Sequence, residues 1–247
     1  MRPTELLDKA AQLPREIYWH FIGQLQTNKC RRLAEEIPNL WAVESVDTSK
    51  KADALEKGRV ALAVRQPEAG KLRVYVQVNT SGKDPPLPLQ HPFHFSPPIS
   101  DRERWRTGES SKSGCTPSEA IGIARHIRET CPHLTLHGLM TIGSIARSQR
   151  SGDEENQDFL LLKETARDVE KELQLPEGDL ELSMGMSSDF EQAITLGATS
   201  VRYVARLGAG VHCGLTVGNR VGTAIFGERP PKQDAQATRD VTTEQKE

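Results

Sequence analysis

LWAVESVDTSKKADALEKG, residues 40–58, contains the unit that decides the fold. Its first part, Leu40–Val46, is a short apolar and β-branched run, which is typical of a buried strand. Its second part is helix-like: Thr48 or Ser49 is suited to cap the start, and Gly58 is expected to end the helix. A strand that leads directly into a helix is half of a βαβ unit, so this stretch predicts parallel strands joined by crossover helices.

The same unit recurs along the chain. Further strands are expected at Tyr18–Gly23, Leu72–Asn79, Leu136–Ile142 and Leu180–Gly185. Helices are expected at Asn28–Ile37, at Pro117–Cys131 after a Thr116 cap, and at Asp158–Leu175, which ends before Pro176. Repeated strand–helix units fit either an open doubly wound sheet or a closed barrel, and the pattern leaves both open.

Composition narrows the class of protein. The 247 residues suffice for one large domain, and 36% apolar with 27% charged residues is a soluble balance. A net charge of -2 provides no basic field for nucleic acid or an acidic membrane surface, and no apolar run is long enough for a bilayer span or a signal peptide. Four widely spaced cysteines, with no CxxC, favour the reducing cytoplasm over a disulfide framework.

Two stretches and the C-terminal tail depart from the strand–helix alternation. Lys83–Gly108 is rich in Pro, His and Arg and has no periodicity, and Tyr203–Arg220 is glycine-rich and apolar. The polar residues 230–247 are expected to be disordered. The sequence therefore predicts one domain over residues 1–229, interrupted by irregular insertions at 83–108 and 203–220.

Two segments have the composition of a phosphate site. In LSMGMSSDFEQAI (Leu182–Ile194), a strand leads into Ser187 and then a helix, whose free N–H groups suit a phosphate. Taken alone, that segment is better explained by simple N-capping by Ser or Asp. In RVGTAIFGER (Arg220–Arg229), Gly222 and Thr223 offer backbone N–H groups and a hydroxyl. In α/β barrels the loops after the last two strands are a favoured phosphate site. The occurrence of two such segments strengthens the interpretation of both as a phosphate site.

Other candidate chemistry is weak. His20 lies inside an apolar strand, where a hydrogen-bonded core histidine is more common than a ligand or base. Lys29 is expected to be a solvated residue at a helix start. The sequence shows no Ser-His-Asp or Cys-His arrangement and no metal-ligand spacing, so no catalytic residue and no metal ligand is predicted.

Five motifs in order resemble the pyridoxal phosphate homeostasis proteins. They are HFIGQLQTNK (His20–Lys29), VQVNTSG (Val76–Gly82), GLMTIG (Gly138–Gly143), LSMGMSSDFEQAI (Leu182–Ile194) and RVGTAIFGER (Arg220–Arg229). The resemblance implies an α/β fold, a (β/α)8 TIM-type barrel like the N-terminal domain of alanine racemase. It implies pyridoxal 5'-phosphate (PLP) at the carboxyl ends of the strands, in a non-catalytic carrier or buffer of vitamin B6.

Residue by residue, the resemblance implies a phosphate cradle of Ser187, Gly222 and Thr223. An arginine before Val-Gly-Thr would face the pyridine nitrogen. Arg220 is favoured for that place because it adjoins the phosphate loop, and Arg202 competes for it. The implied partners are PLP and PLP-dependent apoenzymes. Neither nucleic acid nor a membrane is expected, and the protein is expected to be a cytoplasmic monomer, with a mitochondrial pool as the alternative location.

Three departures from the family pattern bear on function. The family's first two strands, including the Schiff-base lysine, have no counterpart here, so a barrel without its first two strands is expected. Deleting Lys83–Gly108 or Tyr203–Arg220 restores the family pattern, which favours read-through introns over true insertions. Two other interpretations stay open: a PLP-dependent racemase-like enzyme, and an inactive fragment whose open strand edges invite aggregation.

Overall fold

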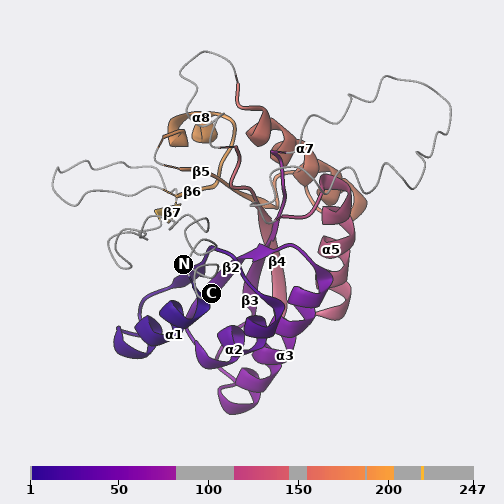
Figure 1. The fold of residues 1–247 in the computed structure, drawn as a ribbon. Helices are drawn as coiled ribbons and strands as arrows, with labels where there is room; N and C mark the ends of the chain where they lie inside the picture. Colours follow the sequence, from indigo (N-terminus) through magenta and orange to yellow (C-terminus); the bar gives the residue numbers. More distant parts are fainter. Residues whose placement is uncertain (1, 82–113, 145–154, 187, 203–217, 220–247) are drawn as a thin grey trace, which may run out of the picture.

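The computed structural model describes residues 2–81, 114–144, 155–186, 188–202 and 218–219 (Figure 1). Helices and strands alternate from α1 to β6, and the next described element is the strand β7. The helices are α1 (Pro3–Gln12), α2 (Thr27–Glu36), α3 (Ser49–Arg65), α5 (Pro117–Thr130), α7 (Gln157–Glu172) and α8 (Phe190–Thr195). The strands are β1 (Trp19–Phe21), β2 (Leu40–Val46), β3 (Leu72–Gln77), β4 (Leu134–Met140), β5 (Glu181–Met186), β6 (Ser200–Arg202) and β7 (Gly218–Asn219).

The strands form one sheet in which every neighbouring pair is parallel and the order is β1-β2-β3-β4-β5-β6-β7. A doubly wound sheet reverses its strand order at a switch point, and this sheet does not. Sequential parallel order is the winding of an α/β barrel. The structure thus decides between the two architectures that the sequence pattern leaves open.

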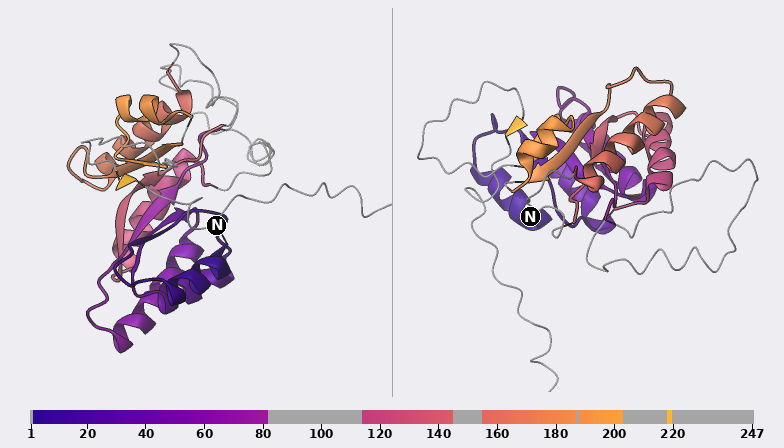
Figure 2. Two further views of the ribbon diagram at one scale, coloured as in Figure 1. Left: turned by 90° about the vertical axis from the view of Figure 1, so that its left-hand side faces the viewer. Right: turned by 90° about the horizontal axis from the view of Figure 1, so that it is seen from above.

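A hydrogen bond across the sheet shows that it is curled. Ser183 Oγ on β5 donates to Glu44 Oε2 on β2 over 2.8 Å, although β3 and β4 lie between the two strands. In a flat sheet, strands three places apart would be separated by roughly 14 Å, beyond the reach of these side chains. Both views in Figure 2 show the same curvature. The described sheet does not close, because β1 and β7 are its two edges.

The two faces of the sheet have separate cores. On the convex face, strand residues pack with the helices in one large apolar cluster that includes Phe21, Val74, Leu139 and Met184. A second, smaller cluster of Ala42, Tyr75 and Met140, joined by Ile22, Trp41 and Ile142, contains no helical residue and lies on the concave face. The helices therefore cover only the outer face, as in a barrel (Figure 1).

Local sequence signals account for the starts of several helices. The Thr48 side chain accepts a hydrogen bond from Lys51 N at the start of α3, and Thr116 with Glu119 forms a capping box on α5. The expectation that Gly58 ends its helix is wrong, because α3 continues to Arg65. A Cβ at Gly58 would lie 2.2 Å from the Arg31 carbonyl oxygen, so this glycine lets α2 approach α3 closely.

The predicted strands are all present, and no end is shifted by more than two residues. Both ends of β4 are shifted by two residues, from the expected 136–142 to 134–140. A helix, α1, precedes β1. Residues 83–108 and the tail 230–247 lie outside the described residues. Of the segment 203–220, only Gly218 and Asn219 are described, and they pair with β6.

In the described part of the chain, no helix combines the length and the apolar composition that crossing a bilayer requires.

Candidate functional site at the carboxyl ends of the strands

The concave face is polar at its centre. The carboxylate of Glu44 on β2 is fully buried and is held by His20 Nδ1 at 2.8 Å and by the Ser183 hydroxyl at 2.8 Å. Burial of a carboxylate is costly unless its oxygens are hydrogen-bonded, and here each oxygen has a partner. These contacts join β1, β2 and β5, so a single carboxylate fixes how three strands curve around the interior.

Aromatic and charged side chains fill the same face toward the amino ends of the strands. The His20 ring stacks on Trp41 at 4.7 Å, and the Arg73 guanidinium lies 4.1 Å from the Trp41 ring centroid. The Tyr75 hydroxyl donates to Glu181 over 2.6 Å. This layer lies toward the amino ends of the strands, at the opposite end of the interior from the carboxyl ends.

At the carboxyl ends, three strands meet through Thr141. Its hydroxyl lies 2.8 Å from that of Thr80 after β3 and accepts from Gly143 N at 3.2 Å. Its carbonyl accepts from Arg202 Nη2 on β6 over 2.6 Å, and Arg202 Nη1 contacts Met140 Sδ at 3.4 Å. Thr80 and Thr141 are buried and Arg202 is half-buried. A guanidinium, two hydroxyls and strand-end N–H groups are thus concentrated at this end.

The turn from β5 to α8 lies at the same edge. Met186 N donates to the Asp189 carboxylate over 2.6 Å, which closes the turn. Gly185, with φ of +91°, permits close packing on α8, because a Cβ there would lie 2.6 Å from the Ala193 Cβ. The predicted cradle residue Ser187 falls in this turn but lies outside the described residues. Arg220, Gly222 and Thr223 also lie outside them, so the predicted cradle stays a prediction.

Other residues singled out in the sequence are described. His20 is hydrogen-bonded to Glu44 and is no isolated ligand, as expected. Lys29 is exposed at the start of α2, which confirms the solvated interpretation. Glu44, Thr80 and Thr141 were missed. For Glu44 the signal was available, because a charged residue inside the apolar run Leu40–Val46 needs a buried partner.

The described cysteines are free and buried. Burial raises the pKa of the Cys30 and Cys115 thiols from 9.0 to about 12, and burial also raises the pKa of Cys131. Since the thiolate is the reactive form, none of these three thiols is an activated nucleophile.

Comparison with known proteins adds the family. The chain is 36% identical over 229 residues to a protein of Schizosaccharomyces pombe named pyridoxal phosphate homeostasis protein, covering 93% of this chain and 73% of that one. A human protein of the same name is 36% identical over 230 residues, covering 91% of this chain and 65% of its own length. The chain thus spans about two thirds to three quarters of these relatives. No family model matches it.

Solved structures agree on the fold. PipY of Synechococcus elongatus, whose structure has PLP bound, aligns with a TM-score of 0.53 at 24% identity, over 82% of this chain and 76% of PipY. An alanine racemase of Clostridium difficile aligns with a TM-score of 0.50 at 13% identity, over 85% of this chain and 47% of the enzyme. The alanine-racemase-type barrel expected from the sequence is confirmed. By its similarity to the curated relatives, the chain belongs to the pyridoxal phosphate homeostasis protein family.

Proposed function

We propose that this protein binds PLP and serves vitamin B6 homeostasis as a non-catalytic carrier or buffer. The observation that carries the proposal is the 36% identity to a pyridoxal phosphate homeostasis protein along 93% of the chain. The bound PLP in PipY, which shares the fold, supports it. We further propose that the protein is a cytoplasmic monomer that passes PLP to apoenzymes. The three free, buried cysteines are consistent with a reducing compartment.

The proposed site lies at the carboxyl ends of the strands. The phosphate is bound by Ser187, Gly222 and Thr223, which follow the last strands of the barrel. The described neighbourhood supports this placement, because the turn after β5 and the end of β6 lie side by side, with Met186 in register with Arg202. Backbone N–H groups beside a guanidinium suit a phosphate ester.

An arginine at the pyridine nitrogen suits a carrier better than it suits an enzyme. Guanidinium stays protonated at physiological pH, so it donates to the nitrogen and leaves the ring uncharged. An uncharged ring is a weak electron sink for carbanion chemistry, which fits a carrier better than a versatile enzyme. We propose Arg220 for this role. Arg202 holds the end of β6 against Thr141, and it is the described arginine placed to replace Arg220.

We propose that PLP is held without a covalent bond to this chain. None of the described strands contains a lysine, so no strand lysine of the described sheet reaches the interior. The described lysines lie on helices or, for Lys71, ahead of β3. Lys51, for example, is paired with Asp47 at 2.6 Å at the start of α3.

The test is a titration of the full chain with PLP and, separately, with pyridoxal. We expect saturable binding of one PLP per chain, much weaker binding of pyridoxal, and no racemisation of L-alanine. Borohydride treatment followed by peptide mass analysis is expected to show no stoichiometric pyridoxyl-lysine. Equal affinity for pyridoxal, or alanine racemisation by the saturated protein, would reject the proposed carrier site.

We propose that residues 1–229 form a single barrel domain, which residues 83–108 and 203–220 interrupt. The second segment matters more, because it separates Arg202 from Val221, Gly222 and Thr223. Deleting 203–220 is expected to join these residues into one strand and to raise both PLP affinity and the thermal midpoint. The segment also contains β7, so an unchanged or lower midpoint would identify it as a genuine structural element.

A further inference from the structure

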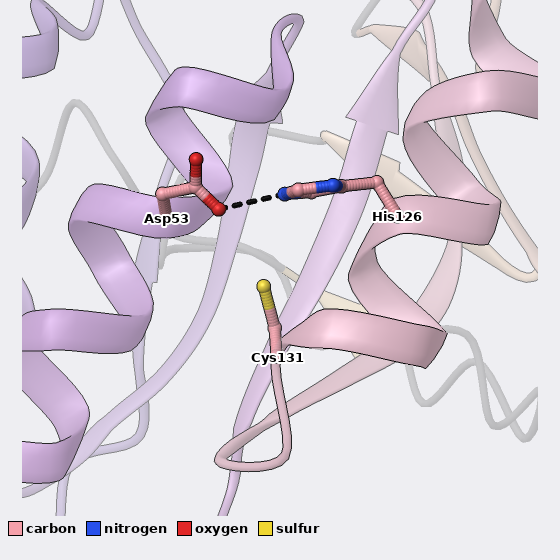
Figure 3. A group of neighbouring side chains, drawn as sticks. All are labelled: Asp53, His126 and Cys131. Atoms are coloured by element: carbon pink, nitrogen blue, oxygen red, sulfur yellow. Dashed lines mark hydrogen bonds and ion pairs between the residues drawn. The ribbon is translucent and has the colours of Figure 1, made fainter.

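A second group of side chains with ligand chemistry lies on the outer surface, between helices α3 and α5. It consists of Asp53 on α3, His126 on α5 and Cys131, the residue that caps the end of α5 (Figure 3). Their ligand atoms all lie within 4.8 Å of one another. The group is outside the barrel interior and has no role in the proposed PLP site.

Each member is fixed by the fold. His126 Nε2 is 2.6 Å from Asp53 Oδ1, which joins the two helices. Cys131 N donates to the Ile127 carbonyl over 3.2 Å, and Leu134 N donates to the Cys131 carbonyl over 3.0 Å, so the backbone holds the thiol in place. The Asp53 and His126 side chains are 46% and 28% exposed, whereas Cys131 is buried. The group thus has a buried sulfur on one side and two partly exposed side chains on the other. Figure 3 shows the Cys131 sulfur directed toward the Asp53–His126 pair.

The donor set matches one class of metal. Thiolate, imidazole and carboxylate are the three ligand types of Zn²⁺, which binds them tetrahedrally at about 2.0–2.3 Å. Ligand atoms in such a tetrahedron are roughly 3.3–3.8 Å apart, so the present spacing needs to change by about 1 Å. Rotation of the partly exposed Asp53 and His126 side chains suffices for such a change. The partly exposed side leaves room for water as the fourth ligand.

A neighbouring pair provides an internal comparison. His133 Nδ1 lies 2.7 Å from Glu56 Oε1, and Glu56 is on α3, three residues after Asp53. This pair likewise joins α3 to the turn after α5. Among the described residues, however, no third His, Cys, Asp or Glu ligand atom lies close enough to complete a group with it. A histidine–carboxylate pair is therefore sufficient to connect α3 to this region. Such a connection does not require the Cys131 thiol that lies beside Asp53 and His126.

We propose that Asp53, His126 and Cys131 form a Zn²⁺ site that links α3 to the turn between α5 and β4. The spacing along the sequence does not show it, because the three ligands come from two helices and a turn that only the fold brings together. The site stabilises the outer helical layer and does not contact PLP.

Cobalt is the probe, because Co²⁺ occupies zinc sites and a Co²⁺–thiolate bond absorbs in the near ultraviolet. The experiment uses the PLP-free full chain carrying Cys213→Ser, which removes the thiol outside the described residues. We expect one Co²⁺ per chain, a thiolate-to-cobalt band, its loss on adding Zn²⁺, and a higher thermal midpoint with Zn²⁺. Asp53→Asn and His126→Gln are expected to weaken Co²⁺ binding by at least about tenfold, and Cys131→Ser to abolish the band.

The matched controls are His133→Gln and Glu56→Gln in the same background, which are expected to retain the band and the affinity. Circular dichroism of each variant checks folding, and Asp53→Asn, at a half-exposed position, keeps the test decisive if Cys131→Ser does not fold. Absence of a band at saturating Co²⁺ would overturn the proposal. So would a band that survives all three ligand substitutions, or equal weakening by His133→Gln and His126→Gln.

Discussion

The two faces of the sheet use the same strands for different purposes. Along β3, Leu72, Val74 and Val76 enter the helix-covered core, while the alternate residues Arg73, Tyr75 and Gln77 face the interior. On the convex face apolar strand residues pack against the helices, and on the concave face the buried Glu44 is paired with His20 and Ser183. Neighbouring residues on a strand point to opposite faces, so one residue packs in the helix-covered core while the next faces the interior, where we propose that the ligand binds. Substitutions on the two faces are therefore expected to have different effects.

The largest effect is expected on the convex face. Leu139 is fully buried in the helix-side core, so Leu139→Ala is expected to lower the free energy of unfolding by about 2–5 kcal/mol. The PLP affinity of the folded protein should not change. Urea denaturation and PLP titration measure the two quantities. Val64→Ala, at a position that is 80% exposed on α3, is the control and is expected to change stability by less than about 0.5 kcal/mol. Equal losses for both variants would contradict the division between faces.

A smaller loss of stability is expected at the centre of the concave face. Glu44→Gln keeps the shape of the side chain but weakens hydrogen bonds to His20 and Ser183 that the buried carboxylate accepts. We expect a loss of about 1–3 kcal/mol in the free energy of unfolding. Ser183→Ala removes one of the two partners and should cost less than Glu44→Gln. If Glu44→Gln is as stable as the parent, the carboxylate does not fix the curvature of the sheet.

At the carboxyl ends, substitutions are expected to affect binding more than folding. Arg220→Gln should weaken PLP binding by about tenfold, equivalent to about 1.4 kcal/mol, with little change in thermal midpoint. Arg202→Gln should have a smaller effect on affinity while residues 203–220 are present, and the larger effect once they are deleted. Isothermal titration of both variants in the intact chain, and of Arg202→Gln in the chain without residues 203–220, decides between the arginines. A larger loss for Arg202→Gln in the intact chain would assign the pyridine nitrogen to Arg202.

The smallest effect concerns a thiol of the convex core. Burial raises the pKa of Cys115 to about 12, so the folded protein keeps this thiol protonated while the unfolded chain ionises it above pH 9.0. The unfolded state then binds fewer protons, and stability falls as pH rises from about 9 toward 12. Cys115→Ala should lessen the fall between pH 8 and pH 10 by about 1 kcal/mol. An identical fall in parent and variant would show that the folded state does not protect this thiol from ionisation.

Local chemistry was predictable from sequence and long-range geometry was not. The caps Thr48 and Thr116 were predictable because their hydroxyls bind a free backbone N–H only a few residues later, which requires no tertiary information. Gly58 was assigned to a helix end, whereas its role depends on α2, which local spacing does not show. The Glu44–Ser183 hydrogen bond joins residues 139 positions apart, so no pattern within one segment predicts it. Strand order, which identifies the barrel, likewise appears only in the folded sheet.

The metal-ligand group of α3 and α5 shows the same limit. Asp53 and His126 are 73 residues apart, and the five-residue spacing of His126 and Cys131 does not by itself mark a metal site. By contrast, the proposed position of the PLP site follows from the sequence pattern, because strand-to-helix turns recur along the chain and the carboxyl ends of parallel strands meet at one edge. The sequence pattern therefore predicts an end of the barrel for ligand binding more readily than it predicts individual contacts.

Hydrogen exchange of the full chain, with and without PLP, tests the central claim that the ligand binds at the carboxyl ends of the strands. We predict slower exchange at residues 141–144, 186–190 and 221–224 when PLP is bound. Amides at the amino ends, such as Leu72 and Leu134, and at Asp53 between α3 and α5, should exchange at the same rate in both samples. Protection confined to the amino ends or to the outer helices would contradict the account.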